Sequence, residues 1–348
     1  MHFAFTDEQG MIAETVRGFF AEKATSERTR KAMAGEGIDR ALWASFCTEL
    51  GLSGVAIPED AGGAGLGLVE LAIIAEAAGA QVAALPLLGH VMASQALAAG
   101  DGDRDVLGEL ISGDKIAAYA HRADLGVNGN TLDGTIEFVA HGSVADCFVV
   151  TTNEAAWLVA VDAPGLTVTP LTTMDQTRPF ARVTLDGVAG RALANPTDAI
   201  VAAHHAGFVV LAAEALGGAQ ACLDRTVAYS LERVQFGRPI GSFQAYKHRL
   251  ADMMVEIEQA RSAVYWAACA LDEGSDEAAL AVHAAKSFAA DTFFRCAGDM
   301  IQLHGGIGFT WEHDAHLFFK RARSIQTLLG DGAWHREQIA TMMLGEAA

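Results

Sequence analysis

Two short segments of the chain hold residue types that bind a nucleotide cofactor. The first runs Arg233-Val-Gln-Phe-Gly-Arg-Pro-Ile-Gly-Ser-Phe-Gln244, and the second runs Gln302-Leu-His-Gly-Gly-Ile-Gly-Phe309. A planar guanidinium offers a fork of donors to a diphosphate, and a neighbouring aromatic ring offers a stacking face to an adenine. Two adjacent glycines at a helix end allow backbone amides to approach the anion. Together the segments predict two parts of one nucleotide-cofactor site.

The elements that must position these segments are mostly helices. Thr6 and Gln9 have the spacing of a capping box, which predicts a helix running to about Ala24. Beyond about Pro196, apolar residues recur at helical intervals and predict long bundle helices, one of which we expect to bury its stripe in a subunit interface. The two stripes are Leu250, Met254, Ile257, Val264 and Leu271, and Ala289, Phe293, Cys296, Met300 and Leu303.

The middle of the chain has a different pattern. From Lys115 onward, short runs rich in valine, threonine and aromatic residues alternate with turn pairs such as Asp133-Gly134 and Pro164-Gly165. This pattern predicts a small antiparallel β domain. The sequence therefore predicts a mainly α protein with a central β domain, divided into an N-terminal helical domain (1–114), a β domain (115–195) and a C-terminal helical bundle (196–348).

Composition and charge exclude several classes of function. The net charge of −19 and the lack of a Lys/Arg cluster disfavour nucleic acids and anionic lipid as partners. We find no signal peptide and no charge-free run of about twenty residues that could span a bilayer, so we expect a soluble cytoplasmic protein without a membrane partner. The five cysteines are widely separated and form no Cys-x-x-Cys pair, which indicates reduced packing residues.

The order, spacing and helical context of the two segments resemble the acyl-CoA dehydrogenase family of flavoproteins. In that family these motifs bind the ADP part of FAD across a subunit interface. The resemblance covers essentially the whole chain, includes Ile57-Pro58-Glu59 and Asp175-Gln-Thr177-Arg178, and is weakest between Lys115 and Gly142. It implies an N-terminal helical domain, a small antiparallel β domain and a C-terminal four-helix bundle.

The resemblance also implies a reaction and a set of ligands. Family members oxidise an acyl-CoA thioester to the α,β-enoyl-CoA: a carboxylate removes the α-proton while hydride leaves to FAD, and electron-transfer flavoprotein accepts the electrons. Six residues of this chain match the family's cofactor motifs. The resemblance implies that they contact the diphosphate and adenosine of an FAD that is bound mainly by an adjacent subunit. They are Arg233, Gln235, Phe236, Gln302, Gly305 and Gly306. Arg238 and Gln244 are secondary candidates.

Two runs depart from the family pattern where members contact the flavin ring. The run Ala117-Ala-Tyr-Ala-His-Arg-Ala-Asp124 lacks the usual Glu-Pro-Gly turn, and Glu137-Phe-Val-Ala-His-Gly142 stands in place of a Trp-x-Ser/Thr element. The resemblance therefore implies that the flavin-facing half of this chain's own site is degraded.

The catalytic base of the family also lacks a clear counterpart. Leu329 occupies the position where many members carry a glutamate, and leucine cannot take a proton. Some relatives place the glutamate on the first bundle helix, which directs attention to Glu214. Burial in its apolar run would raise the pKa of a base there, but an acid with a structural partner is the alternative. Asp331 is the second candidate for the catalytic base, and its alternative role is that of a helix cap or turn residue.

This chain thus retains the residues for the ADP part of the FAD site but lacks those that contact the flavin ring. We therefore predict that a second subunit completes the FAD site. The pattern resembles the α2β2 acyl-CoA dehydrogenases of steroid side-chain breakdown, in which the second acyl-CoA dehydrogenase subunit would supply the flavin contacts and the base. Self-association, an inactive scaffold subunit and a flavin monooxygenase of the same fold are the alternatives. His313 and His316 are a further alternative as metal ligands, but the spacing supplies no third ligand, so we predict no metal. The sequence does not identify the acyl group.

Overall fold

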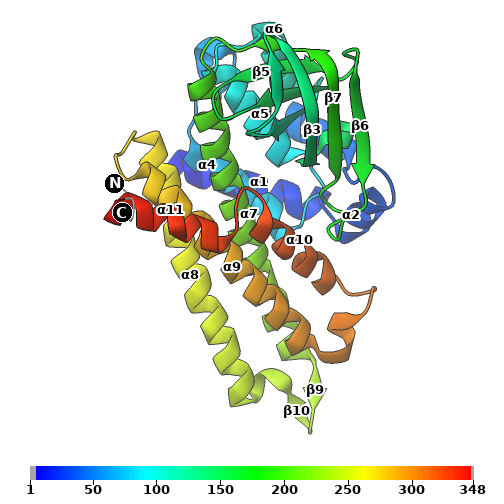
Figure 1. The fold of residues 1–348 in the computed structure, drawn as a ribbon. Coiled ribbons are helices and arrows are strands. Elements are labelled where there is room, and N and C mark those ends of the chain that lie inside the picture. The colour runs from blue at the N-terminus through cyan, green and yellow to red at the C-terminus, as the bar shows by residue number, and fades with distance from the viewer. Residues whose placement is uncertain (1–4, 346–348) are drawn as a thin grey trace. The chain divides into compact units, whose positions relative to one another are not determined.

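The computed structural model describes residues 5–345, which pack as two compact units (Figure 1). Unit 1 combines residues 5–26, 71–83 and 208–345, and unit 2 combines residues 27–70 and 84–207. The predicted division at residues 114 and 195 stays a prediction. The fold itself is confirmed as mainly helical with a central β region and a C-terminal helical bundle.

Unit 1 is built from helices and one short hairpin. Helix α1 confirms the predicted capping box, because Thr6 Oγ1 accepts from the Gln9 backbone amide and the Gln9 side chain accepts from the Thr6 amide. The elements of this unit, two of which extend into unit 2, are α1 (Asp7–Lys23), α4 (Leu68–Ala80), α7 (Pro196–Glu232), β9 (Val234–Gln235), β10 (Arg238–Pro239), α8 (Gln244–Asp272), α9 (Ala278–His304), α10 (Ala315–Thr327) and α11 (Gly332–Leu344).

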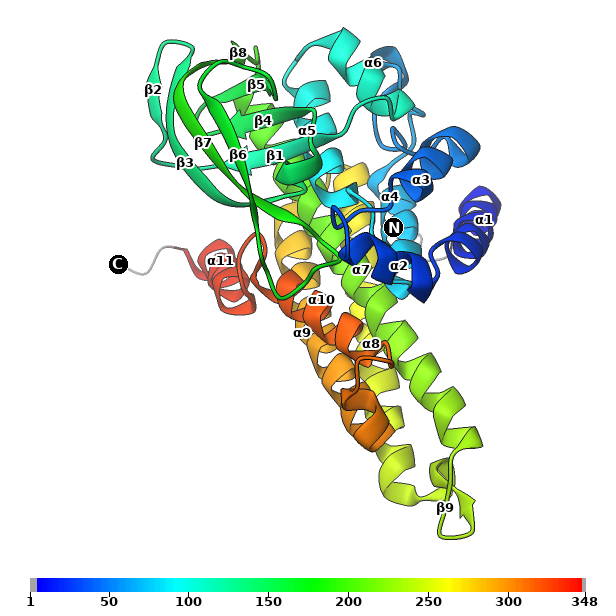
Figure 2. The same ribbon diagram turned by 90° about the vertical axis from the view of Figure 1, so that its right-hand side faces the viewer.

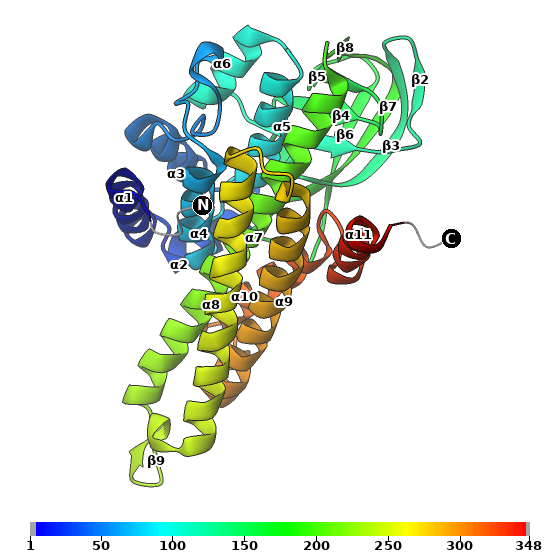
Figure 3. The same ribbon diagram turned by 90° about the vertical axis from the view of Figure 1, so that its left-hand side faces the viewer.

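The bundle helices pack closely because small residues lie where they cross. Figure 3 shows α8 and α9 side by side. A Cβ atom added at Gly217 of α7 would overlap the Glu76 carbonyl of α4, and one added at Gly79 would overlap the backbone of Glu214. The second predicted apolar stripe is confirmed as core, since Phe293 and Met300 of α9 are fully buried.

The first predicted stripe is only partly correct. Ile257 and Val264 of α8 are buried, but Met254 is 52% exposed and Met253 takes its place in the core. The interval of seven between Ile257 and Val264 holds, whereas the core position one turn before Ile257 falls on Met253 and not on Met254. The buried face of α8 therefore runs through Met253, Ile257, Ala260 and Val264.

Unit 2 is an α/β assembly with two four-stranded sheets (Figure 2). The strand orders are β1-β4-β5-β8 and β2-β3-β7-β6. Its elements are α2 (Ser26–Met33), α3 (Arg40–Ser45), α5 (Leu87–Ala99), α6 (Arg104–Ser112), β1 (Ala117–His121), β2 (Gly126–Asn128), β3 (Thr131–Ala140), β4 (Cys147–Thr151), β5 (Ala156–Ala160), β6 (Leu166–Leu171), β7 (Phe180–Ala189) and β8 (Arg191–Ala192).

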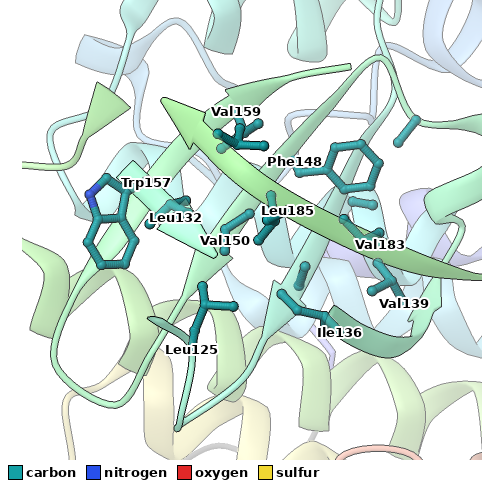
Figure 4. Close-up of a cluster of buried hydrophobic side chains, with 14 residues drawn as sticks. Leu125, Leu132, Ile136, Val139, Phe148, Val150, Trp157, Val159, Val183 and Leu185 are labelled. Carbon is teal, nitrogen blue, oxygen red and sulfur yellow. The ribbon is translucent and has the colours of Figure 1, made fainter. Parts of the chain in front are cut away.

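One strand pair differs from the antiparallel prediction. Strands β1 and β4 are parallel, whereas every other pair in the two sheets is antiparallel. The chain leaves β1, forms β2 and β3 in the other sheet, and returns to β4 in the same direction. Figure 4 shows the core between the sheets, where Phe148 and Val150 from one sheet face Val183 and Leu185 from the other.

Helix α7 also has the length and composition of a membrane span. Its most apolar window is 72% buried inside the structure. Such burial is typical of a core helix in a soluble protein, so this single helix is weak support for a membrane location.

Candidate cofactor site

Five elements of unit 1 meet at one end of the helical bundle. They are the C-terminal end of α7, the β9/β10 hairpin, the N-terminal end of α8, the C-terminal end of α9 and the short 3-10 turn Gly305–Phe309 (Figure 1). Phenol to carbonyl contacts join them: Tyr246 of α8 donates to the Leu303 carbonyl at 3.1 Å, and Tyr229 of α7 donates to the His304 carbonyl at 3.4 Å. All six predicted cofactor residues lie at this end, and all six are exposed.

The hairpin presents an aromatic ring and a guanidinium to solvent. Phe236 and Gly237 form its two-residue turn, and their φ angles of 54° and 76° both lie in the left-handed region, as a type I′ turn requires. A non-glycine residue there costs about 1 kcal/mol. The Phe236 side chain is nevertheless 93% exposed, so its own unit gains little from the ring.

The two arginines of the hairpin differ in their contacts. The Arg238 guanidinium lies 4.0 Å from the centre of the Phe243 ring and is therefore already stacked. The Arg233 side chain makes no ion pair or hydrogen bond within residues 5–345, although its backbone bonds to Tyr229 and Ile240. Arg233 is thus the hairpin cation that is available to an anionic ligand.

Gly305 and Gly306 leave the backbone open where α9 ends. Gly305 has φ 64° and ψ −141°, a conformation that side chains with a Cβ rarely adopt. A Cβ added at Gly306 would meet nothing within 4 Å, and its φ is not in the left-handed region. Neither packing nor backbone conformation therefore requires glycine at residue 306, which fits a close approach by a ligand.

His304, the last residue of α9, packs directly before this loop. Its ring is buried, stacks on Tyr229 at 4.4 Å, and lies 4.5 Å from the ring of His313. Its Nδ1 lies 2.7 Å from the Met300 carbonyl, so that nitrogen carries the proton because a carbonyl can only accept. Burial lowers the pKa of His304, and the nearby His313 lowers it further.

The bundle end also exposes an unusual number of large apolar side chains. Leu231, Phe236, Phe309 and Trp311 are between 62% and 93% exposed, and Val234 and Ile307 are about half exposed. We call these six residues the bundle-end patch. A patch of this kind marks an interaction surface on a soluble protein.

Glu214 and Asp331, the two candidate bases, have structural partners. Glu214 lies on α7 with only 6% of its side chain exposed, and Arg321 of α10 donates to its Oε1 at 2.8 Å. Asp331 is exposed and caps α11 by accepting from the Trp334 amide at 2.8 Å. That hydrogen bond is the main reason why the pKa of Asp331 is lowered, which makes it a weaker base. These contacts support the structural alternative for each acid, and a base role stays a prediction.

Comparison with known proteins identifies the family. Residues 6–103 match the profile of the acyl-CoA dehydrogenase N-terminal domain, and residues 199–344 match that of the acyl-CoA dehydrogenase C-terminal domain. Acyl-CoA dehydrogenase IpdE2 of Mycolicibacterium smegmatis is 37% identical over 93% of this chain and 95% of its own length. The chain belongs to the acyl-CoA dehydrogenase family.

Two solved members of the family match over nearly the whole chain. The ChsE4-ChsE5 complex from Mycobacterium tuberculosis matches with a TM-score of 0.90 and 30% identity, covering 100% of both chains. The Tcur3481-Tcur3483 steroid ACAD G363A variant matches with a TM-score of 0.89 and 32% identity, covering 97% of this chain and 98% of the other. The predicted resemblance to subunits of the heterotetrameric steroid acyl-CoA dehydrogenases is confirmed.

In the run where acyl-CoA dehydrogenases usually carry the Glu-Pro-Gly turn, unit 2 has a compact polar cluster. His121 Nδ1 lies 3.0 Å from Thr151 Oγ1, which donates to the Tyr119 hydroxyl at 2.9 Å, and the His204 ring packs against Tyr119 and His121. Burial lowers the pKa of His204 to about 4. The sequence assigns no role to His204, whose ring contacts lie on a strand far away along the chain.

The second departure from the family pattern is an irregular strand. The β3/β7 register shifts between Ile136 and Val139, and Phe138 at this point has φ 56° and 62% exposure. The segment that replaces the Trp-x-Ser/Thr element therefore still presents an aromatic ring, on a strained backbone.

The loop between α10 and α11 contains Leu329, the residue at the position where a glutamate was expected. Leu329, at the usual place of the glutamate, has φ 54°, and buried Lys286 donates to the carbonyls of Gln326 and Gly330 on either side of it. Burial lowers the pKa of Lys286 to about 8. Hydrogen bonds from this lysine thus hold the loop, and the position at which the sequence resemblance predicts the glutamate carries the apolar side chain of Leu329.

The structure places other features away from the predicted cofactor residues. A cavity of about 880 Å³ in unit 1 is lined by residues that include Arg17, Glu76, Arg261 and Tyr265, and none of the predicted residues contributes to it. His313 contacts the Ala315 amide. Within residues 5–345, no group of three or more His, Cys, Asp or Glu side chains is arranged to hold a metal.

Proposed function

We propose that this chain binds the ADP part of FAD and forms one subunit of an α2β2, FAD-dependent acyl-CoA dehydrogenase. The proposal depends on Arg233, Phe236 and Gly306 at the end of the bundle. Contacts within unit 1 do not explain why these three residue types occur there. Arg233 has no side-chain partner within the described residues, Phe236 occupies a costly left-handed turn in full exposure, and Gly306 lies in open space.

The residues fit the ADP part of the cofactor in charge and shape. The Arg233 guanidinium would pair with the diphosphate, the Phe236 ring would cover the adenine, and the Gly306 amide would face the diphosphate. Gln235 and Gln302 add exposed amide groups on either side. When bound, FAD supplies the hydride acceptor for α,β-dehydrogenation of the acyl-CoA thioester.

The base is assigned to the partner subunit. Glu214 is compensated by Arg321, Asp331 is a helix cap with a lowered pKa, and residue 329 is a leucine. A general base needs a carboxylate that is free to take a proton from the substrate, whereas both acids here have structural partners and leucine has no carboxylate. A second acyl-CoA dehydrogenase subunit would therefore carry the base and the flavin-ring contacts, as the similarity to the ChsE4-ChsE5 complex supports.

The bundle-end patch supports association with such a partner. Six large apolar side chains exposed around the cofactor residues would be buried by a subunit that brings the rest of the FAD site. By analogy with the family, we propose that electron-transfer flavoprotein accepts the electrons. We also propose a cytoplasmic location. The acyl group is left open.

The test is the FAD content of the co-expressed complex with Arg233→Gln. We expect the variant to lose most of its FAD while the two chains still co-purify, because the diphosphate loses its charged donor. Arg104→Gln, which changes an exposed arginine of unit 2, is the matched control and should retain FAD. Normal FAD content in the Arg233 variant would refute the assignment.

The same preparation separates the alternatives. A wild-type complex without FAD would favour an inactive scaffold. A complex that holds FAD and consumes oxygen without an acyl-CoA would favour a flavin monooxygenase.

A further inference from the structure

The proposed diphosphate position has an electrostatic difficulty. Gln302, Gly305 and Gly306 lie at the C-terminal end of α9. A helix C-terminus carries a partial negative charge because its last carbonyls have no partner within the helix. An anion at this point is attracted by the amides of the glycine loop but repelled by the carbonyls just before it.

The last three carbonyls of α9 accept hydrogen bonds from groups outside the regular i to i−4 pattern of the helix. The Gly305 amide donates to the Gln302 carbonyl. Tyr246 Oη donates to the Leu303 carbonyl at 3.1 Å, and Tyr229 Oη donates to the His304 carbonyl at 3.4 Å. Two phenols from two other helices therefore cover the carbonyls that lie nearest to the glycine loop.

Both phenols are held in place by packing. Tyr229 stacks on the buried His304 ring at 4.4 Å with an interplanar angle of 22°. Tyr246 lies in the first turn of α8, where its backbone amide bonds to the Phe243 carbonyl. Burial raises the pKa of Tyr246 to about 12, so its hydroxyl remains a donor at any pH at which the protein would be assayed.

We propose that Tyr246 and Tyr229 are positioning residues of the cofactor loop, whose hydroxyls cover the terminal carbonyls of α9 and so permit a diphosphate to bind at Gly305 and Gly306. This inference rests on the proposed function. Tyr246 makes the shorter contact and has the larger effect. Neither residue touches the reacting atoms, so their effect is on cofactor affinity.

The experiment measures FAD affinity of the co-expressed complex after removal and re-addition of FAD, at low and at high salt. Tyr246→Phe and Tyr229→Phe keep the rings and remove the hydroxyls. We expect Tyr246→Phe to weaken FAD binding about fivefold at low salt, Tyr229→Phe less, and the double variant about tenfold or more. The losses shrink at high salt, because salt screens the repulsion between the anion and the exposed carbonyls.

Tyr265→Phe is the matched control. Tyr265 lies on the same helix as Tyr246, and its hydroxyl donates to Glu76 at 2.6 Å, away from the glycine loop. It should lower thermal stability without changing FAD affinity at either salt concentration. Melting temperatures of all variants show which of them remain folded, and ADP alone serves as a second ligand that reports on the same contacts.

Two results would overturn the inference. One is a double variant whose affinities for FAD and ADP stay within twofold of wild type at low salt. The other is a loss that is equal at low and high salt, or that Tyr265→Phe reproduces, since either would reveal a general structural effect. If Arg233→Gln strips FAD while the tyrosine variants bind normally, the inference fails alone. If Arg233→Gln also binds normally, the proposed function fails.

Discussion

His90 on α5 makes unit 2 sensitive to acid. Its side chain is completely buried, and its ring packs edge-on against Trp43 with 4.8 Å between the ring centres. Burial lowers the pKa of His90 from 6.5 to about 4 in the folded protein. Between these two values the unfolded chain binds a proton that the folded chain does not, so the free energy of unfolding falls as the pH falls.

The size of this effect follows from the two pKa values. A difference of about 2.5 units corresponds to about 3 kcal/mol once the pH is below the folded pKa. At pH 5 the expected loss from His90 alone is about 2 kcal/mol relative to pH 8. Above pH 6.5 the neutral ring contributes no pH dependence.

The assay is urea unfolding followed by circular dichroism at pH 8 and pH 5. His90→Phe keeps a ring against Trp43 but cannot be protonated. The variant should therefore lose about 2 kcal/mol less than wild type between the two pH values. His248→Gln changes an exposed histidine on α8 and should follow the wild type. If His90→Phe loses as much stability as wild type, His90 is not the group that titrates, and the reasoning is wrong.

Three further substitutions test the packing that positions the cofactor end. Glu214→Gln removes the negative charge of the buried Glu214–Arg321 ion pair and should destabilise the chain by about 3 kcal/mol in denaturant titrations. Turnover of the intact complex should stay nearly unchanged, and an inactive complex would make Glu214 the base. Gly217→Ala should prevent soluble expression, because the added Cβ overlaps the Glu76 carbonyl, whereas Gly298→Ala, with open space around it, should express normally. Thr6→Ala should lower the free energy of unfolding by about 1 kcal/mol through loss of the capping box, and an unchanged denaturation midpoint would show that this helix end does not contribute to stability.

Local signals in the sequence predicted much of the fold and several of its helix ends. The capping box at Thr6 and Gln9 depends only on residues three apart, and it is formed as predicted. The glycine pair after a helix likewise predicted where α9 ends. Features of this kind can be read from sequence because the interacting groups are near neighbours along the chain.

Contacts between distant residues could not be predicted in the same way. Glu214 and Arg321 are separated by 107 residues, and Tyr246 and Leu303 by 57. The apolar periodicity of α7 does not indicate which cation lies next to Glu214. The pattern was therefore consistent with Glu214 as a catalytic base and with Glu214 as a structural acid. The parallel pairing of β1 with β4 was missed because strand direction depends on the path through a second sheet.

The turn at Phe236 shows a third limit. Asparagine or aspartate before glycine is the usual signal for a type I′ turn, and phenylalanine seldom adopts the left-handed region. The sequence therefore suggested an aromatic ring near an arginine, but the strained turn that exposes this ring became visible only in the structure.

The flavin to chain ratio tests the central claim most directly. We would measure it by absorbance and native mass for the chain alone and for the chain co-expressed with a dehydrogenase encoded by a neighbouring gene. The account predicts little or no FAD on the chain alone, and about one FAD per pair of unlike chains in an α2β2 complex. One FAD per chain in a homodimer or homotetramer would contradict it, and would return Glu214 to the position of leading base.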